Sequence, residues 1–317
     1  MSIFYLQHSI DTLHKRAEQA LEILRDCRLC PRQCAVNRLE GQTGVCQTAR
    51  QAKIASYNLH FGEEDPLVGQ QGSGTIFFAG CNLGCIFCQN YDISHSTQGA
   101  LEVDARQLAA LMLELQTKGA ANINLVTPSH VLPQILEALP WAVQGGLQLP
   151  LVYNTGGYDL LESLQLAEGL IQIYMPDLKF ADPEPARKYC HAEDYPQTAA
   201  RAVLEMHRQV GDLQLDEQGL ARQGLMIRHL LLPRNLAGTE KWLEFLVREV
   251  SAQTYLNLMD QYRPCGRSEE FPELQAMISA KDLAAAREKA LQHGLHRLDN
   301  RERHGLQAFL RRLHQDW

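Results

Sequence analysis

The chain has 317 residues, of which 45% are hydrophobic, so it can form a globular core and is neither disordered nor fibrous. A net charge of −7 argues against general nucleic-acid binding, which needs a basic surface. No apolar run reaches the roughly 18 residues of a membrane span, and the N-terminus lacks the pattern of a secretion signal. We therefore expect a cytoplasmic protein that binds neither membrane nor nucleic acid. Its nine cysteines then indicate metal or redox chemistry.

The N-terminal part combines a helix with a first cysteine group. Residues 12–26 carry apolar side chains at helical spacing. Four cysteines with the spacing C-x2-C-x3-C-x11-C follow, namely Cys27, Cys30, Cys34 and Cys46. Four thiolates suffice for a zinc ion or an iron–sulfur centre, and the spacing leaves both open, with free structural cysteines as a third alternative. Residues 51–73 contain several glycines and are predicted to be a connector.

From residue 75 onward, short apolar runs alternate with helical patterns. Six strands are predicted, at 75–79, 122–126, 149–153, 171–175, 225–232 and 255–259. The intervening helices are predicted at 104–118, 131–144, 158–168, 182–210 and 239–250. This alternation indicates a parallel sheet covered by helices, either open or barrel-like, with functional groups just after the strands. A helical tail is expected from residue 281 to residue 317.

A second cysteine group directly follows the first of these strands. Cys81, Cys85 and Cys88 have the spacing C-x3-C-x2-C, and Phe87 precedes the third cysteine. Three thiolates on one tight loop can hold three irons of a cubane cluster and leave the fourth iron open to a ligand. The alternatives are a zinc loop that lacks its fourth ligand and three buried free thiols.

This loop resembles the defining motif of the radical S-adenosylmethionine (radical SAM) superfamily in its spacing, its aromatic residue and its place after the first strand. Residues 27–265 resemble a subgroup related to the pyruvate formate-lyase activating enzyme. The shared motifs are Cys-Arg-Leu-Cys-Pro-Arg-Gln-Cys from Cys27, Gly-Ser-Gly-Thr-Ile-Phe-Phe before the loop, Cys-Gln-Asn-Tyr from Cys88, Asn-Ile-Asn-Leu-Val-Thr-Pro-Ser-His, and Gln-Tyr-Arg-Pro-Cys.

The resemblance implies a fold and a mechanism. The expected fold is an α/β partial (β/α)6 barrel at 74–265, preceded by a cysteine-rich metal module at 1–73 and followed by a helical tail at 266–317. A [4Fe–4S] cluster on Cys81, Cys85 and Cys88 would bind the amino and carboxylate groups of SAM at its open iron. One electron, from flavodoxin or ferredoxin, would cleave SAM, and the resulting 5′-deoxyadenosyl radical would abstract a hydrogen from a substrate.

Further SAM contacts are expected after the other strands. Thr127 and Ser129 stand where the superfamily often has Gly-Gly-Glu, which holds the SAM amino group. Backbone carbonyls near Thr127 or the Ser129 hydroxyl would take over this role, unless Ser129 is a helix N-cap. Asn154 is expected beside the ribose and methionine moieties. Asp177 and Lys179 resemble an Asp-Leu-Lys motif near SAM in glycyl-radical-enzyme activases, the alternative being a surface ion pair.

Three more residues complete the set of cofactor-binding candidates, namely Phe87, Arg228 and His229. Alternation along a strand places Arg228 and His229 on opposite faces, so at most one of them points inward. Cys190 and Cys265 stand outside both cysteine groups. We consider Cys265 as a radical relay, but an inert free thiol is the favoured interpretation.

Two classes of function remain. The leading hypothesis is a radical SAM oxidoreductase that resembles the pyruvate formate-lyase activating enzyme and acts on a protein residue, because a six-unit barrel has a lateral opening that admits a peptide loop. A small metabolite is the alternative substrate. The rival class is a non-enzymatic iron–sulfur electron carrier or sensor, which would have no need of a SAM pocket.

Overall fold

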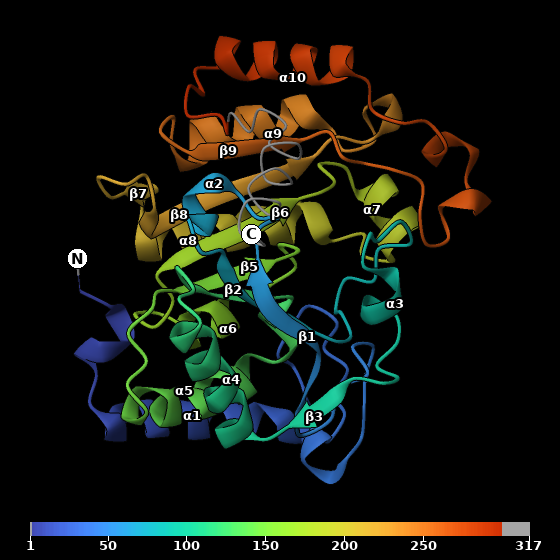
Figure 1. The fold of residues 1–317 in the computed structure, drawn as a ribbon. Coiled ribbons are helices and arrows are strands. Elements are labelled where there is room, and N and C mark those ends of the chain that lie inside the picture. Colours follow the sequence, from blue (N-terminus) through green and yellow to red (C-terminus); the bar gives the residue numbers. More distant parts are fainter. Residues whose placement is uncertain (1, 300–317) are drawn as a thin grey trace, which may run out of the picture.

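The computed structural model describes residues 2–299 and has an α/β fold around one mixed sheet (Figure 1). Neighbouring strands follow the order β3-β1-β2-β4-β5-β6-β8-β7, and β9 also pairs with β8. The strands are β1 (Ala52–His60), β2 (Ser73–Phe78), β3 (Leu101–Val103), β4 (Ile123–Val126), β5 (Leu151–Thr155), β6 (Ile173–Leu178), β7 (Gln214–Leu215), β8 (Ala221–Leu230) and β9 (Tyr255–Met259).

The six strands predicted from the apolar runs are β2, β4, β5, β6, β8 and β9, and they pair in parallel in this order. The predicted α/β class is therefore confirmed. The sheet is not closed, because no pairing among the described strands joins β9 to β1 or β3. Parallel pairing brings the carboxyl ends of these six strands to one edge of the sheet, where functional groups gather in α/β proteins.

Most of the helices pack around the outer face of the sheet, whereas α2 (Asp65–Val68) contributes to the inner-face cluster described below (Figure 1). The other helices are α1 (Ile10–Glu22), α3 (Tyr91–Ser94), α4 (Ala105–Thr117), α5 (Leu132–Gln144), α6 (Leu161–Leu166), α7 (Pro183–Cys190), α8 (Tyr195–Val210), α9 (Thr239–Phe245) and α10 (Ala280–Gln292). Helix α5 packs between α1 and α4, and α10 packs on α9. Within residues 2–299, no helix is long and apolar enough to span a membrane.

The two faces of the sheet bury different clusters. The outer face contributes strand residues such as Ile123 and Leu125 to a large core shared with the helices. The inner face carries a smaller cluster in which Leu67 of α2 meets side chains of β5, β6 and β8, among them Val152, Ile173, Met175 and Met226. This smaller cluster lies below the carboxyl ends of the strands and supports the polar residues described next.

Two predicted segments differ from the structure. The connector predicted at 51–73 was wrong, because it contains β1, which pairs antiparallel with β2, and the short helix α2. The helical material predicted at 182–210 is divided into α7 and α8, and α7 ends at His191 in the left-handed conformation (φ 51°). Helix α10 occupies part of the predicted tail, and residues 300–317 lie outside the described residues.

Candidate active site

The loop after β2 carries the second cysteine group in a conformation that requires glycine. Gly80 has a φ of +82° and Gly84 a φ of +64°, both in the left-handed region. A Cβ atom on Gly80 would lie 2.1 Å from the carbonyl oxygen of Cys46, which belongs to the first cysteine group. The two cysteine groups are therefore in direct backbone contact, and a side chain at position 80 would separate them.

The three thiols of this loop lie close enough to influence one another. Burial, followed by the charge of Cys85, raises the pKa of Cys81 to about 12. The adjacent Cys190 thiol and burial raise the pKa of Cys85, and burial followed by Cys85 raises that of Cys88. Lys179 acts in the opposite sense on both Cys85 and Cys88, so a cation from β6 faces this loop.

A buried charged cluster holds that cation in place. The Asp177 carboxylate accepts hydrogen bonds from Lys179 Nζ and from Arg228 Nε, both at 2.7 Å. Arg228 Nη2 donates to Asn154 Oδ1, also at 2.7 Å. Burial opposes ionisation of Asp177, but Arg228 and Lys179 outweigh it and hold its pKa below the usual range. The carboxyl ends of β5, β6 and β8 are thus joined by one network, in which Asp177 is 8% exposed.

Tyr195 of α8 fixes the backbone beside this cluster. Its hydroxyl accepts a hydrogen bond from the Lys179 N–H at 3.0 Å, and lies 2.9 Å from the Gly156 carbonyl and 2.8 Å from the Asp177 carbonyl. The loops after β5 and β6 therefore share one anchor. Nothing in the sequence pattern distinguishes Tyr195 from an ordinary buried helix residue.

The segment before β2 adds two buried carboxylates that sequence reasoning missed. Glu63 lies 3.5 Å from Arg228 Nη1, and Glu64 accepts a hydrogen bond from Asn257 of β9 at 2.7 Å. Glu64 is 3% exposed, and its second carboxylate oxygen has no hydrogen-bond partner within residues 2–299. Two adjacent glutamates in a segment taken for a connector were the only signal that could have indicated them.

Thr127 and Ser129 follow β4 but do not share one environment. Thr127 has a φ of +63°, which is a strained conformation for a β-branched residue. Ser129 lies 2.9 Å from Thr155 Oγ1, whose hydroxyl donates to the buried Asp159. This network is on the opposite face of β5 from Asn154. The predicted N-cap role of Ser129 is also wrong, because Val131 occupies the N-cap position of α5.

His229 and Phe87 also lie away from the charged cluster. His229 is buried on the outer face, with Nδ1 2.7 Å from the Leu178 carbonyl and Nε2 2.9 Å from Thr239 Oγ1. Arg228 points to the inner face, so the two neighbours diverge as strand alternation requires. The ring of Phe87 packs edge-on against Phe180 and is 3% exposed, which anchors the cysteine loop on the core.

The first cysteine group surrounds a buried arginine. Cys27, Cys30, Cys34 and Cys46 line one cavity together with Arg38. Arg38 is 1% exposed; its Nη1 donates to the His130 carbonyl at 2.9 Å and lies 3.8 Å from Cys27 Sγ. Its Nη2 has no hydrogen-bond partner in the described part of the chain. A buried cation with a free donor beside four thiols suits an anionic metal–thiolate centre.

Arg32 connects this group with the rest of the site. It donates to the carbonyls of Asn82 and Leu83 in the second cysteine loop, at 2.8 and 2.9 Å. It also donates to the carbonyls of Cys190, at 2.7 Å, and His191. Arg32 thus joins the first cysteine group to two segments that are distant in sequence, 82–83 and 190–191.

A single metal ion and a cubane cluster require different arrangements of thiols. Among residues 2–299, no group of three or more histidine, cysteine, aspartate or glutamate side chains is arranged to hold a metal ion. A cubane cluster sets a different requirement, because each thiolate binds a different iron and the sulfurs need not converge on one point. The neighbouring thiols of Cys81, Cys85 and Cys88, on a loop with two glycines and near the Lys179 cation, fit such a cluster.

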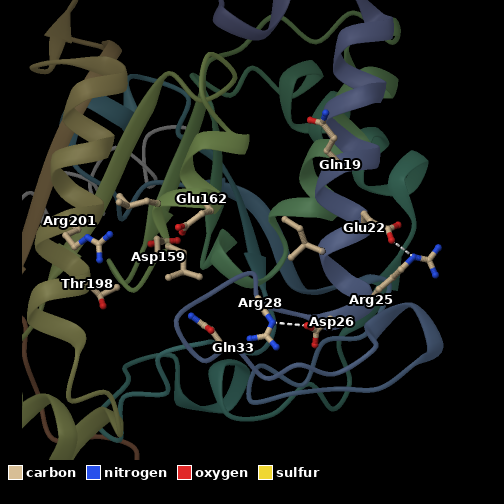
Figure 2. Close-up of a pocket in the computed structure, with 13 residues that line it drawn as sticks. Gln19, Glu22, Arg25, Asp26, Arg28, Gln33, Asp159, Glu162, Thr198 and Arg201 are labelled. Carbon is tan, nitrogen blue, oxygen red and sulfur yellow. Dashed lines mark hydrogen bonds and ion pairs between the residues drawn. The ribbon is translucent and has the colours of Figure 1, made fainter.

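A large open cavity of about 830 Å³ lies away from these thiols, between α1, the loop around Arg28, and helices α6 and α8 (Figure 2). Its charged walls are partly self-paired, with Arg25 2.6 Å from Glu22 and Arg28 2.8 Å from Asp26. None of its lining residues belongs to the network of Asp177, so we do not assign the chemistry to this cavity.

Comparison with known proteins gives few relatives. No protein-family model matches the chain. The chain is similar to a protein of Methanocaldococcus jannaschii described as uncharacterized, with 29% identity over 292 residues, 89% of this chain and 79% of that protein. It also resembles the crystal structure of a radical SAM methyltransferase from Sphaerobacter thermophilus, with a TM-score of 0.48 and 13% identity. That match covers 70% of this chain and 64% of the other, which is less than two thirds of the other chain's length.

The buried His229 predicts how stability depends on pH. Burial lowers its pKa to about 4, below the usual 6.5. Between these values the unfolded chain binds a proton that the folded chain does not, so stability falls as the pH drops from 6.5 towards 4. The loss attributable to His229 is on the order of 3 kcal/mol at most.

Urea unfolding of the wild type and of His229→Gln at pH 7, 6 and 5 tests this. We expect the variant to lose less stability on acidification. The remaining slope has contributions from His130, whose pKa burial also lowers to about 4, and from His95, whose pKa burial lowers as well. Exposed His296→Gln is the control and should keep the wild-type slope. Equal slopes for His229→Gln and the wild type would contradict the prediction.

Proposed function

We propose that the chain is a radical SAM enzyme whose [4Fe–4S] cluster is held by Cys81, Cys85 and Cys88. The observation that carries the proposal is the position of Lys179, paired with Asp177, opposite the thiols of Cys85 and Cys88. An electron carrier needs thiols but has no need of a buried charged network from the ends of β6 and β8 beside them. When bound, the cluster supplies the electron that cleaves SAM and generates the 5′-deoxyadenosyl radical.

The chain's own residues have distinct tasks in this proposal. The three thiolates hold three irons and leave one iron for SAM. Lys179 offsets the negative charge of the thiolates, and its orientation is set by Asp177. Arg228 and Asn154, already hydrogen-bonded to each other, offer a cation and an amide for the carboxylate or ribose of SAM. The SAM amino group needs an acceptor, and a backbone carbonyl near Thr127 is better placed than Ser129, which faces Thr155.

The finer proposal is an activity similar to that of glycyl-radical-enzyme activases, with a protein residue as substrate and flavodoxin or ferredoxin as electron donor. The unclosed sheet supports a protein substrate, because the gap between β9 and the edge formed by β1 and β3 leaves one side of the strand ends uncovered by strands. The match of Asp177 and Lys179 to the activase motif supports it as well. A small metabolite is the second candidate substrate.

Replacing one cluster ligand tests the radical SAM chemistry. Cys85→Ser removes a thiolate, and we expect the formation of 5′-deoxyadenosine from SAM with dithionite to fall to background. The matched control is Cys265→Ser, which changes a thiol that donates a hydrogen bond to the Phe87 carbonyl, and it should retain SAM cleavage. SAM cleavage by Cys85→Ser at the wild-type rate would refute the cluster assignment.

The first cysteine group is proposed to hold a separate metal centre, either an iron–sulfur cluster or zinc. For zinc the four thiols would have to move together, because the described side chains are not arranged around a single ion. We expect the triple variant with alanine at Cys81, Cys85 and Cys88 to retain metal, because Cys27, Cys30, Cys34 and Cys46 are unchanged. Retained zinc identifies a zinc site, and retained iron with sulfide identifies a cluster. A protein free of both, while still folded by circular dichroism, would eliminate the second site.

A search for a glycyl radical tests the protein substrate. The reduced enzyme with SAM is incubated with candidate glycyl-radical proteins from the same cell, and we expect one of them to develop a glycyl radical in electron paramagnetic resonance spectra. The Cys85→Ser enzyme is the control for radicals of other origin. No signal with any candidate, combined with SAM turnover stimulated by a small molecule, would replace the protein substrate with a metabolite.

A further inference from the structure

The two cysteines outside both groups, Cys190 and Cys265, belong to other segments but pack against the loop of Cys81–Cys88. Cys190, the last residue of α7, donates a hydrogen bond from its thiol to the sulfur of Cys85 at 3.2 Å, across 105 residues of sequence. Cys265 donates to the Phe87 carbonyl oxygen at 3.1 Å. The difference matters, since Cys190 contacts a proposed ligand sulfur and Cys265 contacts only the backbone of the loop.

The backbone around Cys190 is fixed from two sides. Arg32 donates to its carbonyl at 2.7 Å, and the carbonyl of the preceding Tyr189 accepts from the Ile86 N–H at 3.0 Å. Cys190 is 1% exposed and Cys85 is 7% exposed. The contact between the two sulfurs is therefore held by anchors on both chain segments, and bulk water has little access to replace the Cys190 thiol as a donor.

We propose that Cys190 is a positioning residue for the cluster, which donates a hydrogen bond to the Cys85 thiolate and raises the reduction potential of the cluster. The inference rests on the proposed function, because it requires a cluster bound by Cys85. Reduction adds negative charge to the cluster and its thiolates. A donor to one of these sulfurs therefore stabilises the reduced form more than the oxidised form. Burial strengthens this hydrogen bond, since the surroundings do not screen it as water would.

The experiment is a redox titration of the reconstituted full-length protein, followed by electron paramagnetic resonance. The signal to follow is the one that changes when SAM is added, which separates this cluster from any centre on the first cysteine group. Cys190→Ala and Cys190→Val remove the donor, and valine also fills the space of the thiol. We expect both variants to shift the midpoint potential to more negative values, whereas Cys190→Ser, which retains a donor, shifts it less. Cys265→Ala should keep the wild-type potential.

Several results would overturn the inference. They are an unchanged or more positive potential in Cys190→Ala and Cys190→Val, and a shift in Cys190→Ser as large as that in Cys190→Ala. If alanine and valine abolish cluster binding, measured as iron and sulfide content, retention by serine supports the role of the donor, and loss from serine as well overturns it. A wild-type protein that holds a cluster but does not cleave SAM would refute the proposed function and leave the comparison of potentials valid.

Discussion

A carboxylate buried between two cations is the interaction on which the candidate site depends. Asp177 accepts hydrogen bonds from Lys179 and Arg228, and each of the three charges would be costly to bury alone. Removing one partner of a buried ion pair typically costs about 3–5 kcal/mol, because a charge is left uncompensated. The Asp177 carboxylate therefore fixes the positions of the Lys179 ammonium near the thiols and of the Arg228 guanidinium beside Asn154. Charged hydrogen bonds thus join the ends of the three strands above the apolar cluster of their inner face.

Two arginines of the first cysteine group, Arg38 and Arg32, attach this segment to the rest of the fold through hydrogen bonds to backbone carbonyls. Arg38 is surrounded by backbone carbonyls and by Cys27, and Arg32 donates to four carbonyls on two segments. A guanidinium carries five N–H donors in a rigid plane, which lysine cannot reproduce. A stretch with few apolar side chains is thus attached to the sheet by charged hydrogen bonds.

The extent to which the sequence predicts this structure differs by element. The six parallel strands could be predicted because strands buried on both faces are apolar throughout, as in the run from Thr75 to Phe78. Strand β1 was missed because it is partly exposed and mixes polar with apolar residues. Strand alternation separated Arg228 from His229. It could not place Ser129, which follows the left-handed Thr127 in a 3-10 turn that directs it to the outer face.

Contacts between distant segments were beyond sequence reasoning. Cys190 and Cys265 lie 105 and 178 residues from their partners Cys85 and Phe87, and a single sequence contains no signal that joins them. Glu63 and Glu64 were missed for a related reason, since their partners Arg228 of β8 and Asn257 of β9 lie more than 160 residues away along the chain. Nothing in the local sequence distinguishes such residues from ordinary ones, and their place in the site is visible only in the folded structure.

The anchors of the loop of Cys81–Cys88 determine when a cluster can be inserted. Ile86 donates its N–H to Tyr189 and accepts from the Arg267 N–H at 2.8 Å, and Gln89 donates to the Gln261 carbonyl at 3.0 Å. These partners are synthesised long after the cysteines, and contacts of such sequence separation form late in folding. The loop therefore reaches its shape only when nearly the whole sheet has assembled. Under the proposed function, iron and sulfide would therefore reach this loop in the folded protein rather than in the nascent chain.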